Sequence, residues 1–229
     1  SDFPTEKKDR MFFISPRTDL SKCNLKASNL YDADLSHANL SSTDLREADL
    51  SNAVLKEVDF RKSDLRKTKL KGADLTNAKF DCSLYDKDTE FPEDFEPEEQ
   101  NMYKIDPSAA LEYCDLSYMQ LSGSNLTNAN FKGAILIKTQ FKGTDIDSAD
   151  LSDAKLNGAD LRSAKLSNAK LDGADFTGCL YDDDTKFPAN FKCENRSMFR
   201  ISAEVDLSNL DLSNCHLNKA KLKSANLRK

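Results

Sequence analysis

Several residue types on which functional sites commonly depend are scarce in this chain. Its 229 residues contain no tryptophan, seven glycines and only two histidines, His37 and His216. No glycine-rich segment has the spacing of a phosphate-binding loop, and two isolated histidines give no sign of a Ser-His-Asp or Cys-His catalytic set. These absences argue against an enzyme and predict no bound cofactor.

Long apolar runs and a secretory leader are also lacking. No stretch approaches the roughly 18 consecutive apolar residues of a membrane-spanning helix, and no short apolar segment follows a basic start. The chain is 38% hydrophobic and 31% charged, with a formal net charge of −6. We therefore expect no membrane insertion. A cytoplasmic location is favoured, with the periplasm and the thylakoid lumen left open.

What the sequence does contain is a five-residue repeat. Each pentad reads small residue, Asp/Asn/Lys, Leu, polar, polar, as in Ala33-Asp34-Leu35-Ser36-His37. We name these the small position, the polar position, the centre, and the first and second corner positions. Centres recur every fifth residue over 20–80, 111–176 and 207–227, and Phe or Ile replaces Leu at a few of them.

A period of five fits neither a helix face nor a flat strand. A helix with every fifth residue apolar would spread leucine around all its sides, and a strand would alternate with a period of two. The backbone must instead change direction once per pentad, so that every centre points the same way. Solenoids meet this demand, because each coil contacts only its neighbours. The small residue fits beside the centre because two large side chains would overfill the interior.

The repeat resembles the A(D/N)LXX consensus of the pentapeptide-repeat family. The resemblance implies an all-β fold, a right-handed quadrilateral β-helix in which four pentads form one square coil. Residues 20 apart would then stack about 4.8 Å apart, Phe60 on Phe80 and Leu20 on Leu40. The pentads of this chain would make about eight coils in total.

Two interruptions of the pentads repeat each other. Tyr85-Asp86-Lys87-Asp88-Thr89-Glu90-Phe91-Pro92 aligns, 96 residues later, with a segment that begins at Tyr181. Such YDxxTxFP segments resemble those of cyanobacterial pentapeptide-repeat proteins. The predicted organisation is an N-terminal segment (1–17), array 1 (18–82), insertion 1 (83–108), array 2 (109–178), insertion 2 (179–204) and array 3 (205–229).

The insertions are expected to cover coil surfaces that would otherwise invite edge-to-edge association. Asp86, Asp88 and Thr89 predict an Asx-type turn or a helix cap, and a short helix is expected over 96–104. Docking of a partner is the alternative role. Nothing resembling a cap follows array 3, so its last coil could be covered by its own Lys and Arg residues, by further chain or by end-to-end self-association.

The cysteines and acidic clusters fit the repeat better than a metal site. Cys23, Cys114, Cys179 and Cys215 hold the small position, where a thiol behaves as a small apolar side chain. No CxxC pair occurs. Asp182-Asp183-Asp184 lacks the glycine and distal glutamate of a calcium loop. We therefore expect structural thiols and no metal ion.

Charge is distributed unevenly along the chain. Residues 83–108 carry −7, whereas residues 18–82 are neutral. Some pentapeptide-repeat proteins mimic duplex DNA and bind gyrase, which requires an acidic rod. Here lysines interleave with aspartates, and one basic cluster is interpreted as a solvated face, so nucleic-acid binding is not expected. That cluster comprises Arg61, Lys62, Arg66, Lys67, Lys69 and Lys71.

The sequence therefore predicts a non-enzymatic β-helical scaffold for protein–protein interaction, with an unidentified protein partner. A DNA-mimicking inhibitor or protector of a type II topoisomerase is the alternative. The docking residues are expected in the insertions, with Phe91 and Glu98 exposed. The full set is Phe91, Phe95, Glu96, Glu98 and Glu99, with Phe187 and Phe191 in the second copy.

Overall fold

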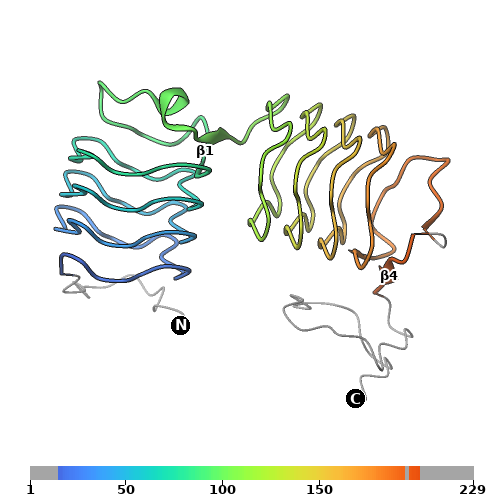
Figure 1. Ribbon diagram of the computed structural model, residues 1–229, viewed down its shortest axis with the longest axis horizontal. Coiled ribbons are helices and arrows are strands. Elements are labelled where there is room, and N and C mark those ends of the chain that lie inside the picture. The colour runs from blue at the N-terminus through green and yellow to red at the C-terminus, as the bar shows by residue number, and fades with distance from the viewer. Residues whose placement is uncertain (1–14, 194–195, 202–229) are drawn as a thin grey trace, which may run out of the picture. The chain divides into compact units, whose positions relative to one another are not determined.

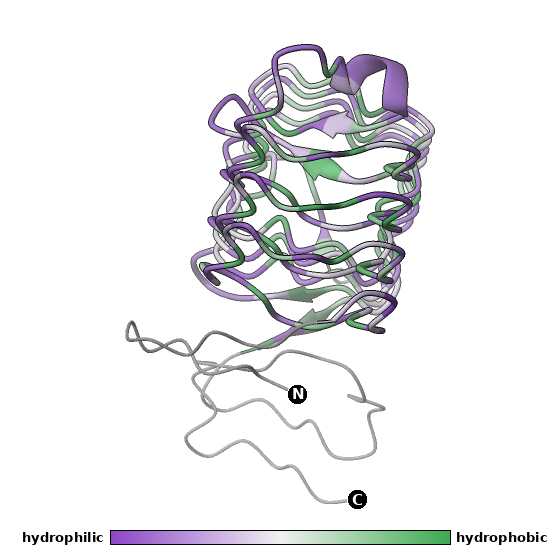
Figure 2. Ribbon diagram, turned by 90° about the vertical axis from the view of Figure 1, so that its left-hand side faces the viewer, coloured by the Kyte–Doolittle hydropathy of each residue, from purple (hydrophilic) through white to green (hydrophobic). Residues whose placement is uncertain are grey.

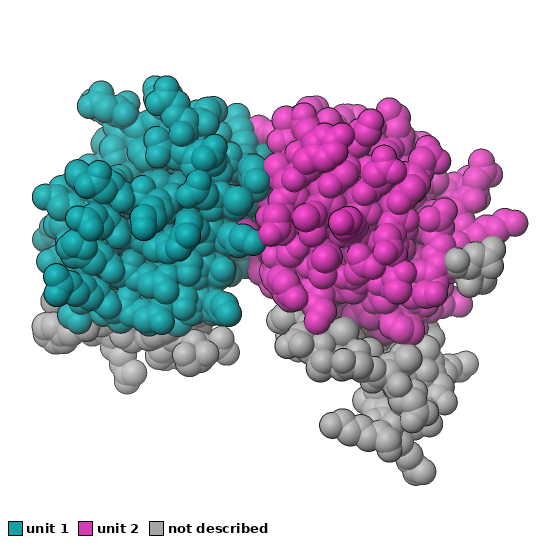
Figure 3. All heavy atoms as spheres, viewed as in Figure 1, with its two compact units in different colours: residues 1–105 teal, residues 106–229 magenta. Residues whose placement is uncertain are grey.

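The computed structural model describes residues 15–193 and 196–201. The chain divides into two compact units, Ser1–Ile105 and Asp106–Lys229, which Figure 3 draws in different colours. Most of the predicted N-terminal segment and all of array 3, with Cys215 and His216, lie outside the described residues.

Each unit is a stack of coils joined by parallel bridges between residues 20 apart (Figure 1). Asp19 pairs with Asn39 and Asn39 with Asp59, and the same spacing runs through the second unit. The predicted right-handed quadrilateral β-helix and its register are therefore confirmed. The predicted total of about eight coils includes array 3, which the structure does not describe.

The corners explain why the repeat has five residues. The second corner position takes a left-handed conformation, with φ of 59° at Lys22 and 61° at His37. The next N–H then folds back onto the preceding centre, as Cys23 N donates to the carbonyl of Leu20 at 3.2 Å. One such turn per pentad changes the direction of the chain and returns every centre to the inside.

The polar position closes each corner with its side chain. Asp34 Oδ1 accepts the N–H of Ser36 at 3.0 Å, and Asn39 Oδ1 accepts that of Ser41 at 3.1 Å. This is why the consensus prefers Asp or Asn there, since a short side chain with an acceptor oxygen reaches the N–H two residues on. Lysine at this position can pair across coils instead, as Lys165 does with Asp145 at 3.1 Å.

Backbone hydrogen bonds give every coil two different edges. The centre and the second corner position donate to the following coil, as Leu40 N does to Asp59 O at 2.8 Å and Ser42 N to Arg61 O at 2.9 Å. The polar position donates to the preceding coil, as Asp59 N does to Ala38 O at 3.0 Å. The bonds therefore connect only neighbouring coils.

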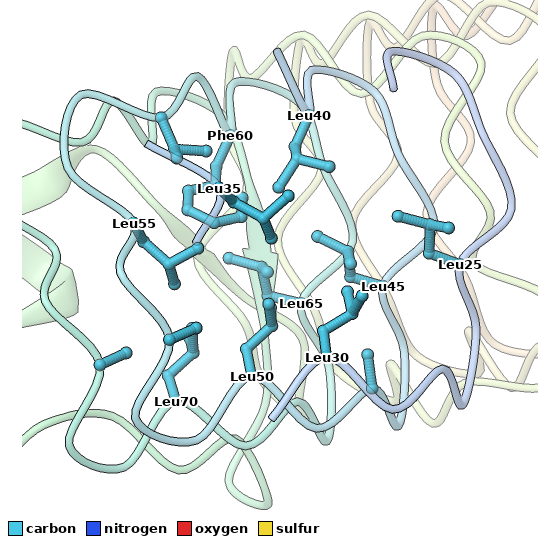
Figure 4. Packing of buried hydrophobic residues seen from close by; sticks show 14 of the residues in the cluster. Leu25, Leu30, Leu35, Leu40, Leu45, Leu50, Leu55, Phe60, Leu65 and Leu70 are labelled. Carbon is cyan, nitrogen blue, oxygen red and sulfur yellow. The ribbon is translucent and has the colours of Figure 1, made fainter. Parts of the chain in front are cut away.

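The core is a set of ladders formed by the centres and small positions. The leucines from Leu35 to Leu50 are fully buried, and Figure 4 shows the labelled centres pointing into the coil interior. Phe60 stacks on Phe80 with ring centroids 5.1 Å apart, which confirms the predicted pairing. Hydrophobic and hydrophilic residues alternate along each coil in Figure 2.

In the described part of the insertions lie four short strands and the 3-10 helix η1. Strand β1 (Leu84–Tyr85) pairs in parallel with β2 (Tyr103–Lys104), and β3 (Leu180–Tyr181) pairs with β4 (Phe199–Arg200). The 3-10 helix η1 spans Pro97–Gln100. No helix within the described ranges is long and apolar enough to cross a membrane.

The prediction of a helix over 96–104 is therefore wrong beyond residue 100. Asn101 takes a left-handed conformation, with φ of 53°, and ends the 3-10 turn. Tyr103 then donates its N–H to Ser83 O at 2.8 Å and Ile105 donates to Tyr85 O at 2.8 Å. Pairing with the coil edge outweighs continued helix formation in this short segment.

Candidate functional site

We name residues 85–105 the first exit segment and residues 181–201 the second. In the first, Asp86 replaces a carbonyl that the next coil would have supplied. Its Oδ1 accepts the N–H of Lys67 at 3.0 Å and the N–H of Asp88 at 3.1 Å. Thr89 Oγ1 accepts the N–H of Asp86 at 3.1 Å and lies 3.0 Å from the carbonyl of Leu65. The predicted Asx-type turn is confirmed.

The second exit segment repeats this arrangement. Asp182 Oδ1 accepts N–H groups from Ser163 at 2.8 Å and from Asp184 at 3.1 Å, and Thr185 Oγ1 lies 3.0 Å from Leu161 O. Burial raises the pKa of the Asp182 carboxyl, but these hydrogen bonds outweigh burial and hold its pKa below the ordinary value. The acidic and hydroxyl residues of the signature therefore serve the turn.

The aromatic residues of both segments pack back onto the last coil. Phe95 meets Phe80 edge to face at 5.0 Å and stacks on Phe91 at 4.8 Å. In the second segment, Phe191 meets Phe176 at 5.1 Å and stacks on Phe187 at 4.7 Å. Apolar side chains thus cover the end of each described stack.

This packing corrects one expectation about the docking residues. Phe91 is half-buried against the core rather than exposed, and Phe95, Phe187 and Phe191 are half-buried as well. Burial of one side of each ring matches the covering role predicted for the insertions. A partner-binding role for these rings stays a prediction.

The predicted carboxylates behave differently from the rings. Glu96, Glu98 and Glu99 are all exposed, and the latter two lie in the first turn of η1. Glu98 accepts a hydrogen bond from the hydroxyl of Tyr85 at 2.8 Å, and this bond lowers the pKa of the Glu98 carboxyl. Tyr85 is 5% exposed, so a core residue fixes one carboxylate of the surface cluster.

The duplication supplies an internal comparison between the two exit segments. Both close their coils with the same Asp-Thr turn and the same pair of phenylalanines. Yet the acidic side chains of the first segment are mostly neutral or basic in the second. The aligned pairs are Glu90 and Lys186, Glu93 and Ala189, Asp94 and Asn190, Glu96 and Lys192, and Glu99 and Asn195. Glu98 keeps its charge as Glu194, and the neutral Gln100 aligns with Arg196.

Arg196 lies over the aromatic base of the second segment. Its Cζ is 4.7 Å from the ring centroid of Phe191, as in a cation–π contact. Closure of a coil therefore tolerates a cation where the first segment has a neutral amide. The second segment also makes the same turn and ring pair with Ala189, Asn190 and Lys192 in place of three carboxylates, so these carboxylates are not required for closure.

The other candidate residues from the sequence have structural partners. Cys179 is buried and its thiol donates to Leu156 O at 2.9 Å, and burial raises the pKa of this thiol. Asp183 accepts a hydrogen bond from Arg200 Nε at 2.9 Å. Over the described ranges, no three His, Cys, Asp or Glu side chains converge as a metal site would require.

The basic cluster is balanced within its own pentads. Arg61 Nε donates to Asp59 at 2.9 Å and Arg66 Nε donates to Asp64 at 2.8 Å. Each guanidinium therefore pairs with the carboxylate two residues before it. Arg61 is exposed as expected, but Arg66 is buried, so the prediction of a solvated face is wrong for Arg66.

Among the described residues, three large exposed aromatic side chains were not predicted from the sequence. Tyr31 is 57% exposed at a first corner position of the first unit. Tyr113 and Tyr118 hold second corner positions and are 71% and 64% exposed. A signal was present in the sequence, because alignment of the two units at 96 residues sets them opposite Arg17 and Lys22.

Known families match most of the chain. A model described as a pentapeptide repeat region matches residues 16–88. A second, described as pentapeptide repeats (8 copies), matches residues 114–153, 144–180 and 203–229. No curated protein matches the chain.

Solved structures of similar proteins come from several sources. The pentapeptide repeat protein alr5209 of Nostoc PCC 7120 is 33% identical, over 38% of this chain and 85% of its own, with a TM-score of 0.29. HetL, involved in heterocyst differentiation regulation in Nostoc sp. strain PCC 7120, is 32% identical over 71% and 76%, with a TM-score of 0.26. Full-length QnrB1, a plasmid-mediated fluoroquinolone resistance protein, is 13% identical over 81% and 91%, with a TM-score of 0.34.

Proposed function

Because the chain belongs to the pentapeptide-repeat family, we propose that it is a non-enzymatic β-helical scaffold that binds a protein partner. The proposed docking residues are the exposed carboxylates Glu96, Glu98 and Glu99 of the first exit segment. Phe91 and Phe95 form the packed base beneath them, and Phe187 and Phe191 form the equivalent base in the second segment.

One observation carries this proposal. The two exit segments close their coils in the same way but differ in the number of acidic side chains that they carry. Like charges held close together repel and destabilise the compact state. The first segment nevertheless surrounds Glu98 with four further carboxylates, whereas the second segment keeps of this cluster only the equivalent of Glu98, Glu194. The four are Glu93, Asp94, Glu96 and Glu99. The charge therefore serves something other than closure. A partner surface rich in lysine and arginine would complement it.

The position of Glu98 supports a docking role. Its hydrogen bond to Tyr85 fixes one carboxylate oxygen, and its lowered pKa keeps the group ionised at neutral pH. A carboxylate that is already oriented loses less conformational entropy on binding than a free side chain does. Glu98 is therefore the residue of this cluster whose loss should weaken binding most.

Affinity capture of partner proteins by the full chain tests the proposal. The test variant carries the second segment's residues in the first, as Glu93→Ala, Asp94→Asn, Glu96→Lys and Glu99→Asn, together with Glu98→Gln. It should keep the thermal stability of the wild type, because these residues are exposed. Its affinity for a basic partner should fall at least about tenfold, which is the scale of one or two interfacial charge pairs.

A control also removes negative charge, three units against the six of the test variant, but does so away from the cluster. Asp32→Asn, Glu47→Gln and Glu57→Gln alter exposed corner positions of the first unit. Binding should survive in this control. A partner captured equally by wild type and by the segment-swap variant would move the docking site elsewhere on the scaffold.

Mixed charge on the coil faces argues against the topoisomerase alternative. Lys165 pairs with Asp145 at 3.1 Å and Lys170 with Asp150 at 3.5 Å, across neighbouring coils. A surface that imitates the phosphates of duplex DNA would need uncompensated negative charge along such rows. A gyrase supercoiling assay separates the two functions, since a scaffold without DNA mimicry leaves supercoiling unchanged.

A further inference from the structure

One face of the second unit carries apolar residues where other faces are polar. It lies between two corners, and bridges join Asp115 to Ile135, Ile135 to Lys155 and Lys155 to Asp175, one residue per coil. In its second coil, Ile135 holds the polar position and Ile137 the first corner position, and both are half-buried. Two isoleucines therefore occupy outward positions that usually carry Asp, Asn or Ser.

Two tyrosines border this isoleucine pair. The ring of Tyr113 lies against Gly133, where an added Cβ would come within 2.6 Å of Tyr113 Cε1. The ring of Tyr118 lies 5.9 Å from Lys138 Nζ. Residues 133 and 138 are the corners on either side of Ile135 and Ile137. Both exposed rings are therefore held at the level of the isoleucines.

The first unit shows that the coil does not require these residues. At the equivalent positions, 96 residues earlier, it has Arg17 and Lys22 for the tyrosines and Asn39 and Ser41 for the isoleucines. Ile135 also cannot provide the corner hydrogen bond that Asn39 makes to Ser41 at 3.1 Å.

The apolar residues carry a cost that folding does not explain. Tyr113 and Tyr118 hold large rings in solvent at positions where the first unit has Arg17 and Lys22. Exposed apolar surface that serves no packing role usually marks a contact with another molecule. Tyrosine is also among the residues that dominate binding energy at protein interfaces.

We propose that this face binds the same face of a second copy of the chain, with the two solenoid axes antiparallel. The dimer face comprises Tyr113, Asp115, Tyr118, Ile135, Ile137 and Lys155.

Charge complementarity selects this occupant and this direction. In one column, Asp115 lies one coil before Ile135 and Lys155 one coil after it. A twofold axis along the strand direction at the isoleucine level sets Ile135 on Ile135 of the second copy. It also sets Asp115 opposite Lys155 of the second copy, and does so twice. The first unit cannot pair in this way, because Asp19 and Asp59 hold both equivalent positions.

A parallel arrangement of the two copies lacks this match. It would exchange the two columns of the face, so that Asp115 met Ser117 and Lys155 met Asn157 of the second copy. Neither charge would then meet an opposite charge across the interface. Complementary charges across an interface fix its register and disfavour arrangements that leave a charge without a match. The antiparallel pairing is therefore the arrangement that the face itself specifies. Its small area predicts a weak, reversible dimer.

Sedimentation velocity of the full chain tests self-association over about a hundredfold range of concentration, because dimerisation follows mass action. The wild type should shift from monomer to dimer. Ile135→Asn with Ile137→Ser, the residues of the first unit, should weaken association at least about tenfold, as lost interface anchors do. This variant should fold normally, since Asn39 and Ser41 fill the same positions in the first unit. Val54→Asn removes a half-buried apolar side chain from a polar position of the first unit and should change nothing.

A charge exchange tests the direction. Asp115→Lys and Lys155→Asp should each weaken the dimer, and the double variant should restore it. The fold tolerates lysine at this position, as Lys165 and Lys170 show. Three outcomes overturn the proposal: a wild type that stays monomeric throughout, an isoleucine variant that dimerises as the wild type does, or a double variant that fails to recover.

Discussion

At the scale of the residue, each pentad position has one physical task. The centre fills the interior, the small position leaves room for it, the polar position closes the corner, and the second corner position turns the chain. Polar residues at the small position obey the same constraint. Thr43 is buried, and its hydroxyl donates to Leu20 O at 2.8 Å. A hydroxyl is accepted inside because it finds an acceptor in the preceding coil.

Leu50→Asp tests the assignment of the centres. Leu50 is fully buried among other leucines, and an unpaired carboxylate there should destabilise the first unit by more than about 4 kcal/mol. Thermal unfolding followed by circular dichroism should show the loss. Ser51→Asp, at the neighbouring outward position, is the control and should change little. Unaltered unfolding of Leu50→Asp would contradict the register of the coils.

At the scale of the element, the exit segments show what a local pattern can and cannot predict. The Asx-type turn was predictable, because Asp86 and Thr89 bond within a few residues of each other. Strand β2 was not, because Tyr103 pairs with Ser83, and that contact exists only once the coil has closed. The apolar residues predicted packing, but their pattern does not distinguish a coil of the same chain from a partner protein as the surface on which they pack.

Asp182→Ala should destabilise the second unit by about 1 kcal/mol, because the half-buried N–H of Ser163 and the exposed N–H of Asp184 lose their acceptor. Asp182→Asn keeps an acceptor oxygen and should recover part of this loss. Asp183→Ala is the matched control, since Asp183 is exposed and bonds only to a surface arginine among the contacts described above. The thermal unfolding midpoints of the three variants should therefore rise in the order Asp182→Ala, Asp182→Asn, Asp183→Ala. Equal effects at 182 and 183 would contradict the capping role.

At the scale of the whole molecule, the carboxylates at polar positions act together. Hydrogen bonds from the residue two further on hold the pKa of Asp34, Asp74, Asp150 and Asp175 below the ordinary value of 3.8. The hydroxyl and the backbone N–H of that serine or threonine both donate to the carboxylate and favour its charged form. The pentad thus repeats one small pH-dependent contribution through both units.

The sign of this contribution predicts an acid-sensitive fold. A carboxyl group with a lowered pKa in the folded state stabilises that state fully above the unfolded value, and the gain disappears as pH falls through the folded value. The thermal midpoint should therefore be nearly constant from pH 8 to about pH 5 and should fall below about pH 4. Circular dichroism melts across this range measure it. A midpoint that rises on acidification would contradict the assignment.

The duplication also bounds what the sequence could predict at this scale. Period and register follow from five residues at a time, so coils and core were predictable throughout the described residues. The surface of the faces could not be predicted in this way, because Tyr113 and Ile135 lie outside the core and violate none of its packing rules. They stand out only by comparison with Arg17 and Asn39, the equivalent residues of the other unit.

The bonding of each coil only to its neighbours has a consequence for how the protein is made. Partners in the bridges are 20 residues apart, so the average contact spans about a tenth of the chain, a contact order typical of helical bundles rather than β proteins. A newly synthesised coil finds its template already complete, since the preceding coil left the ribosome first. Folding can then keep pace with translation, and few strand edges need to wait uncovered for distant sequence to arrive.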